Sequence, residues 1–261
     1  MHVEDGSIVV EGLTKVFNGF VAVDHISFTI RDGELFGLLG PNGAGKSTTM
    51  RMLTTLLRPT EGDAYVGGYS VKREPDKVRL LIGLVSDKLI VYDRLTAREN
   101  LRFFGNLYGL GGKRREERID ELLEEVNLTR FADKPVGTFS TGMKQRLNLV
   151  RALLQNPKVL FLDEPTLGLD PQTVRFIKDL IIQLHESDIT IVLTTHEMAL
   201  AEELSERLAI IDHGKILAIG EPKKLEEENG VKNLEELFLK LTGRQLRDSL
   251  GKESASLRLA R

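Results

Sequence analysis

Residues 35–48 read LFGLLGPNGAGKST, an apolar run that passes directly into a glycine-rich loop. The run is typical of a buried β-strand, and a helix is expected from about Lys46 to Leu57. The loop fits the pattern G-x-x-x-x-G-K-[ST], in which glycines let backbone N–H groups converge on phosphate and the helix start adds positive potential. The fixed positions of this pattern are Gly40, Gly45, Lys46 and Ser47. The stretch therefore predicts a strand–loop–helix unit that binds the phosphates of a nucleotide.

Each position of this loop is a candidate contact to the nucleotide. Lys46 is expected to reach the β- and γ-phosphates, and the Ser47 hydroxyl to ligate Mg²⁺. The alternative is a glycine-rich turn that binds nothing, which is disfavoured because the loop follows a buried strand and opens a helix. The candidate contacts are Gly40, Pro41, Asn42, Gly43, Ala44, Gly45, Lys46, Ser47 and Thr48.

Two further strand ends carry polar side chains suited to phosphate chemistry. VLFLDEP at 159–165 ends a buried strand with two acids, of which Asp163 is expected to hold Mg²⁺ and Glu164 to polarise the attacking water as general base. His196 ends the next such strand, ITIVLTTH, and is placed to donate a hydrogen bond to the γ-phosphate. The alternatives are solvated acids that cap a strand and a structural histidine.

The composition excludes several classes of protein. With 41% hydrophobic and 29% charged residues among 261, the chain has the balance of a globular protein. A net charge of −3 argues against bulk attraction to nucleic acid, and the lack of cysteine excludes disulfides and thiolate chemistry. No signal peptide and no apolar run of 18 residues is found, so any membrane role is expected to run through a partner.

Buried strands alternate with helices along the chain, which predicts an α/β protein with a doubly wound or P-loop NTPase sheet. Thr96 and Glu99 form a capping box that opens a helical block extending to about Gln155, inserted between core strands. Asp170 and Pro171 are expected to cap a helix through Leu184, and a hairpin is expected to turn at 213–214. We expect one domain over 1–220, with the block at about 96–155 inserted in it, and a helical tail over 221–261 whose end is disordered.

Taken in order, GPNGAGKST, STGMKQR, LFLDEP, LGLD and TTH resemble the nucleotide-binding subunit of ATP-binding cassette (ABC) transporters over about residues 7–220. The resemblance implies a mixed sheet core with an antiparallel β subdomain and an inserted helical subdomain. It also implies that two copies, or this chain and a homologue, close head-to-tail around two Mg-ATP. A separate membrane permease would receive the motion, the protein would lie on the cytoplasmic inner face of the membrane, and no nucleic acid partner is expected.

The same resemblance assigns roles to single residues. Phe17 falls where the family places an aromatic ring that stacks on adenine, although a phenylalanine in the strand core is the alternative. Ser140 and Gly142 match the signature that contacts the γ-phosphate of ATP on the opposite subunit, and Asp170 matches the loop that faces the dimer partner.

Three positions depart from the family pattern. The usual signature Leu-Ser-Gly-Gly-Gln reads FSTGM at 139–143, which keeps the serine and one glycine. Asp87 replaces a glutamine that contacts Mg²⁺ and the attacking water; an anionic oxygen can still ligate Mg²⁺, whereas the alternative is that it faces solvent or pairs with Lys88. Phe17 replaces the commoner tyrosine, and stacking does not need the hydroxyl.

An aromatic-rich stretch follows, and it is either packed between helices or part of a groove for a permease helix. It contains Tyr92, Phe103, Phe104, Leu107 and Tyr108. IVYDRLTARENL, STGMKQR and FLKLTGRQLRD look like type-two exporter ATPases, which move drugs, polysaccharides, sodium or unidentified cargo. The alternatives are a soluble ABC ATPase acting on nucleic acid, the ribosome or an assembly scaffold, and a nucleotide-binding regulator without turnover.

Overall fold

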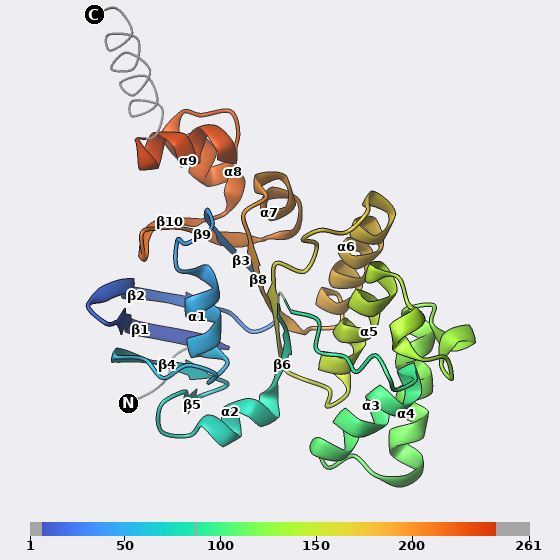
Figure 1. Cartoon of the computed structure of the whole chain (residues 1–261). Helices are drawn as coiled ribbons and strands as arrows, with labels where there is room; N and C mark the ends of the chain where they lie inside the picture. The colour runs from blue at the N-terminus through green and yellow to red at the C-terminus, as the bar shows by residue number, and fades with distance from the viewer. Residues whose placement is uncertain (1–6, 87, 244–261) are drawn as a thin grey trace, which may run out of the picture.

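The computed structural model describes residues 7–86 and 88–243, and it contains two β-sheets with helices packed around them (Figure 1). The smaller sheet is antiparallel, with strand order β2-β1-β4-β5, and lies at the blue end of the colour scale. Its strands are β1 (Ile8–Phe17), β2 (Phe20–Ile30), β4 (Glu61–Val66) and β5 (Tyr69–Ser70). Asp87 and the end of the tail, 244–261, lie outside the described residues.

The larger sheet has six strands in the order β10-β9-β3-β8-β7-β6. All neighbours are parallel except the β9–β10 hairpin, which turns at His213 and Gly214 as expected. The strands are β3 (Leu35–Leu39), β6 (Ile82–Val85), β7 (Val159–Asp163), β8 (Thr190–Thr195), β9 (Arg207–Asp212) and β10 (Lys215–Gly220). This mixed sheet beside an antiparallel one confirms the α/β fold expected from the sequence.

Successive residues of the central strands enter different hydrophobic clusters, which explains their uninterrupted apolar sequences. Leu35 packs towards the helices on one face of the sheet, whereas Phe36 packs towards the antiparallel sheet on the other. Leu160 and Phe161 repeat this alternation on β7. Parallel strands buried on both faces leave no position for a polar side chain except at their ends.

The helices divide between the two sides of the larger sheet. In Figure 1, α3, α4, α5 and α6 lie on the side away from the antiparallel sheet, and α8 and α9 lie near β10. The helices are α1 (Lys46–Leu53), α2 (Pro75–Leu81), α3 (Ala97–Leu107), α4 (Gly112–Glu125), α5 (Thr141–Leu153), α6 (Pro171–His185), α7 (Met198–Leu204), α8 (Pro222–Asn229) and α9 (Leu234–Thr242). Two 3₁₀ turns lie between α4 and α5, at Thr129–Phe131 and Val136–Thr138.

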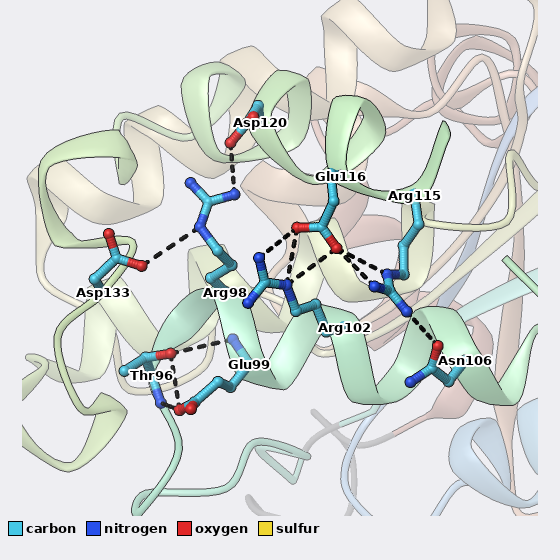
Figure 2. Close-up of polar contacts among 9 residues, drawn as sticks. All are labelled: Thr96, Arg98, Glu99, Arg102, Asn106, Arg115, Glu116, Asp120 and Asp133. Carbon is cyan, nitrogen blue, oxygen red and sulfur yellow. Dashed lines mark hydrogen bonds and ion pairs between the residues drawn. The ribbon is translucent and has the colours of Figure 1, made fainter. Parts of the chain in front are cut away.

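The capping box predicted for α3 is present. The Glu99 backbone N–H donates to the Thr96 hydroxyl oxygen at 3.1 Å, and the Thr96 N–H donates to the Glu99 carboxylate at 2.8 Å. Asp170 caps α6 with Pro171 in its first turn, also as predicted. Figure 2 shows how charged side chains then join α3 to α4, with Glu116 placed between Arg102 and Arg115.

Helix α1 ends at Leu53, so the expectation that it continues to Leu57 is wrong. The Thr54 hydroxyl donates to the carbonyl oxygen of Met50 at 2.8 Å, and Thr55 adopts a left-handed conformation with φ 63°. A β-branched residue in that conformation breaks the helical path. None of the helices in 7–86 and 88–243 combines the length and apolarity needed to cross a membrane.

Candidate active site

The glycine-rich loop runs from the end of β3 to the start of α1 and packs closely on its neighbours. A Cβ at Gly40 would collide with the carbonyl oxygen of Ile211, and a Cβ at Gly45 would lie 2.7 Å from that of Ala22. Gly45 also has φ 110°, a conformation that side-chain-bearing residues rarely adopt. The backbone path therefore requires both glycines, and it ends at a helix N-terminus, where an anion is favoured.

Lys46 is buried beside this loop, with 5% of its surface exposed. Its ammonium donates to the carbonyl oxygens of Gly40 at 2.7 Å and Pro41 at 3.2 Å. It also lies 3.2 Å from Oε1 of Glu164, at the end of β7. A buried ammonium needs such partners because removing a charge from water is costly. The positive charge is thus held inside the loop, against the predicted general base.

The Asp163 carboxylate accepts hydrogen bonds from hydroxyl groups on two other elements. The Ser47 hydroxyl, in the first turn of α1, donates to Oδ1 at 3.1 Å, and the Thr194 hydroxyl, on β8, donates to the same oxygen at 2.5 Å. Asp163 is almost fully buried. The structure therefore brings together Ser47 and Asp163, two of the three residues that the sequence predicts as Mg²⁺ ligands.

Glu164 leaves the strand in a left-handed conformation, with φ 51°. Its backbone N–H donates to both the carbonyl and the hydroxyl oxygen of Thr194, at 3.2 and 3.1 Å. The side chain places one carboxylate oxygen on Lys46 and the other 2.9 Å from Nδ1 of His196. The two predicted catalytic residues, Glu164 and His196, are therefore in direct contact with each other.

A pocket of about 360 Å³ opens beside the loop. Phe17, on β1, lines this pocket with 42% of its surface exposed. The ammonium of Lys15, on the same strand, lies 5.1 Å from the centre of the Phe17 ring. Two other residues of this pocket, Phe20 and Leu167, were not predicted from the sequence. Phe20 lies at the other end of the β1–β2 turn from Phe17 and is 67% exposed. The lining residues are Phe17, Phe20, Ala22, Pro41, Asn42, Gly43, Gly45, Lys46, Ser47, Thr48, Glu164 and Leu167.

Ser140 and Asp170 line a different pocket, of about 290 Å³, that shares no residue with the first. Ser140 caps α5, its hydroxyl oxygen accepting from the N–H of Met143 at 3.2 Å. Asp170 accepts from the N–H and the hydroxyl of Thr173, at 3.0 and 2.7 Å, and these bonds lower the pKa of its carboxyl. A Cβ at Gly142 would collide with the hydroxyl oxygen of Thr173. These candidates therefore form a second group, apart from the phosphate loop.

A buried contact that was not predicted from the sequence links the two groups. Nε2 of Gln145, on α5, donates to the carbonyl oxygen of Pro165 at 2.9 Å, next to Glu164. A glutamine in a polar helix gives no signal of its partner, because that partner lies 20 residues further along the chain. Asp87, the third predicted Mg²⁺ ligand, lies outside the described residues and keeps only its sequence-based prediction.

Within 7–86 and 88–243, no group of three or more His, Asp and Glu side chains is placed to hold a metal ion by itself. The Ser47 hydroxyl and the Asp163 carboxylate nevertheless fit Mg²⁺, which prefers hard oxygen ligands and is commonly bound with substrate phosphates. A metal at this position would therefore take its remaining oxygens from nucleotide and water.

Comparison with known proteins gives consistent results. The family model described as ABC transporter matches residues 23–167. The chain is 44% identical to the linearmycin resistance ATP-binding protein LnrL of Bacillus subtilis over 80% of this chain and 68% of that protein. It is 40% identical to the doxorubicin resistance ATP-binding protein DrrA of Mycobacterium tuberculosis, over 95% of this chain and 74% of that protein.

Solved structures agree with these relatives. An ATP-binding subunit of an ABC transporter superposes with a TM-score of 0.82 at 31% identity, covering 90% of this chain and 99% of that one. A dimeric ATP-binding cassette in a post-hydrolysis state, bound to ADP and Pi, gives a TM-score of 0.74 at 29% identity, covering 82% and 98%.

Proposed function

The chain belongs to the ABC transporter family, and from this membership we propose that it is the ATP-hydrolysing subunit of an exporter whose permease is a separate chain. It is an ATP-binding protein with an ATPase domain. The observation that carries the proposal is the contact of Lys46, Glu164 and His196 beside the phosphate-loop pocket. Two relatives are named for resistance to linearmycin and doxorubicin, which supports a drug-like small molecule as the cargo.

Each residue around the loop has its own role in ATP binding or hydrolysis. Lys46 and the loop N–H groups bind the β- and γ-phosphates, and Ser47 and Asp163 would hold Mg²⁺. Bound there, Mg²⁺ would supply positive charge to the phosphate oxygens. Glu164 orients the attacking water and accepts its proton as the water oxygen bonds to the γ-phosphorus. The bond from the γ-phosphorus to the bridging oxygen breaks in the same step, and ADP leaves with that oxygen. His196, in contact with Glu164, donates a hydrogen bond to the γ-phosphate.

The base of the nucleotide is placed against the β1–β2 turn. Phe17 offers an exposed ring face on the wall of the pocket, and the Lys15 ammonium is near the same ring. Adenine stacks on such a ring without needing a hydroxyl, so phenylalanine serves in place of tyrosine. Phe20 lines the same pocket and adds apolar surface.

A second subunit, either another copy or a homologue, completes the active site. Ser140 caps the 13-residue helix α5, whose N-terminus favours an anion. This group lies apart from the phosphate loop of its own chain, so we assign it to the γ-phosphate of ATP held by the partner, with Asp170 facing that partner. The similarity to a dimeric cassette supports this arrangement. Closure follows from contacts to the γ-phosphate, and hydrolysis removes them.

The permease is placed against the aromatic region around α3. Phe104 is buried and serves the core, but Tyr92, Phe103 and Leu107 expose 40–67% of their surfaces. Tyr92 and Phe103 pack edge to face, with ring centres 5.2 Å apart. Exposed aromatic and aliphatic side chains of this kind suit the apolar face of a partner helix. The protein would then lie on the inner face of the cell membrane.

Glu164→Gln in the full-length chain tests the catalytic assignment. Loss of the general base should lower the ATPase rate by at least about 10²-fold while ATP binding is kept, because glutamine cannot accept the proton. Glu186→Gln, an exposed change at the end of α6, is the matched control and should leave the rate unchanged. The Glu164→Gln protein should also dimerise with ATP in size-exclusion chromatography. A monomer at saturating ATP would contradict the two-subunit site.

Affinity purification from native membranes tests the transport assignment. The tagged chain should recover a protein with several membrane-spanning helices. Recovery of nucleic acid or ribosomes instead would overturn the exporter assignment and favour a soluble ABC ATPase.

A further inference from the structure

Thr194, on β8, is fully buried and contacts both Asp163 and Glu164. We propose that Thr194 is a positioning residue for ATP hydrolysis, which holds the Asp163 carboxylate and the Glu164 backbone with one hydroxyl group. This role rests on the proposed function, because it concerns the same active site. The sequence shows Thr194 only as one of two threonines before His196.

The hydroxyl hydrogen is directed to Asp163. β7 and β8 are parallel, and Asp163 is the register partner of Thr194, which places the two side chains side by side. The Thr194 hydroxyl donates to Oδ1 of Asp163, with the two oxygens 2.5 Å apart. A hydrogen bond to a carboxylate is stronger than one between neutral groups. Ser47 donates to the same oxygen, so the carboxylate is held from two directions.

The lone pairs of the same hydroxyl remain for Glu164. With its hydrogen engaged, the Thr194 oxygen accepts from the Glu164 N–H at 3.1 Å. Glu164 is a non-glycine residue at φ 51°, a conformation that persists only where neighbouring contacts impose it. This backbone turn directs the carboxylate onto Lys46 and His196. The hydroxyl thus supports the placement of the general base as well as that of the predicted Mg²⁺ ligand.

One hydrogen bond between β8 and Glu164 does not depend on this hydroxyl. The Glu164 N–H also donates to the Thr194 backbone carbonyl at 3.2 Å, a bond that any residue at position 194 would keep. Valine matches threonine in shape but lacks the donor and acceptor, so Thr194→Val removes both contacts from a folded strand. Serine keeps the hydroxyl without the methyl group, so Thr194→Ser separates hydrogen bonding from packing.

Thr190 supplies a matched control on the same strand. It is also buried, and its hydroxyl oxygen accepts from the N–H of Gly33 at 2.9 Å, at the opposite end of β8 from the acids. Thr190→Val therefore removes a buried strand hydroxyl without touching the active site. Full-length wild type and the three variants are compared by kcat, KM and thermal unfolding. The affinity for a fluorescent ATP analogue is measured with Mg²⁺ and with EDTA.

We expect Thr194→Val to lower kcat by roughly 10- to 100-fold, because this is the range for losing a hydrogen bond to a charged group. KM should change by less than about threefold. The gain in analogue affinity from Mg²⁺ should shrink, while affinity in EDTA stays as in wild type. Thr194→Ser should restore kcat to within about fivefold, and Thr190→Val should keep wild-type kinetics.

Two results would overturn the role of Thr194. One is wild-type kcat and Mg²⁺ response in Thr194→Val; the other is a Thr194→Ser enzyme as slow as Thr194→Val, which would make the site sensitive to packing alone. Failure of the proposed function looks different, because wild type itself would then show no turnover that Glu164→Gln abolishes.

Discussion

Replacing Glu116 by glutamine should weaken the attachment of α4 to α3, because the Glu116 carboxylate of α4 pairs with Arg102 of α3. It also pairs with Arg115 of α4, which itself contacts α3. Arg102 lies 2.7 Å from one carboxylate oxygen and Arg115 lies 2.8 Å from the other. Figure 2 shows the three side chains between the two helices, with Arg115 reaching on to Asn106. The hydrogen bond from Arg102 is the main cause that lowers the pKa of Glu116 to about 2, with Arg115 adding to it against the effect of burial.

The size of the effect follows from this pKa. A shift from 4.5 to about 2 corresponds to about 3.4 kcal/mol at 1.36 kcal/mol per unit. The side chain is 29% exposed, so water screens the pair, and well-exposed ion pairs contribute only about 0–1 kcal/mol. We therefore expect Glu116→Gln to lower the free energy of unfolding by about 1–2 kcal/mol at pH 7.

The stabilisation by Glu116 should decrease as the pH falls. Because the pKa is lower in the folded protein, the stabilisation is fully present above the unfolded pKa near 4.5 and is lost as the pH falls towards 2. Urea denaturation of wild type and Glu116→Gln should therefore show a difference that shrinks to under about half by pH 3. Glu117→Gln, which removes a more exposed partner of Lys113, should cost less than about 0.5 kcal/mol. Equal urea midpoints at pH 7, or a difference that does not change with pH, would refute the reasoning.

Two other changes test the candidate site. Phe17→Ala should weaken ATP binding by about 3- to 10-fold without affecting inorganic triphosphate, because only the base loses its stacking partner. Isothermal titration with both ligands measures this, and equal losses for the two would contradict a base contact. Gly142→Ala should lower the free energy of unfolding by about 1–3 kcal/mol, because the new methyl group meets the Thr173 hydroxyl. An unchanged urea midpoint would contradict this, because it would mean that α5 and α6 can shift to accept the methyl group without loss of stability.

The features that the sequence predicted correctly are those whose partners are near in the chain or whose position follows from strand ends. The Thr96 and Glu99 capping box and the Asp170 cap each bridge three residues. Lys46, Asp163, Glu164 and His196 meet because parallel strands deliver their carboxyl ends to one edge of the sheet. Chain order and apolar runs are enough to place such residues.

The features that were missed depend on which strand or helix lies next to which. The Thr194 hydroxyl meets Asp163 across 31 residues, and Gln145 on α5 meets Pro165 in the turn after β7. Phe20 reaches the pocket because the β1–β2 turn places it opposite Phe17. The end of α1 was predicted too late in the chain, because the helix is broken by the left-handed backbone of Thr55. A threonine in the sequence does not by itself predict that conformation. Register and turn conformation, not residue type, decide these contacts.

The two retained positions of the signature do not carry equal weight as candidates for phosphate binding. Gly142 faces Thr173 so closely that any side chain would collide, so packing of α5 on α6 alone explains the glycine. Ser140 has no such constraint: it is exposed at the start of α5, and its hydroxyl oxygen accepts only the local N–H of Met143 among the contacts that the described residues show. Its hydroxyl hydrogen can therefore be donated to an anion without breaking that cap. Ser140→Ala should thus weaken the contact between subunits. A change at Gly142 should first disturb the packing of α5 on α6.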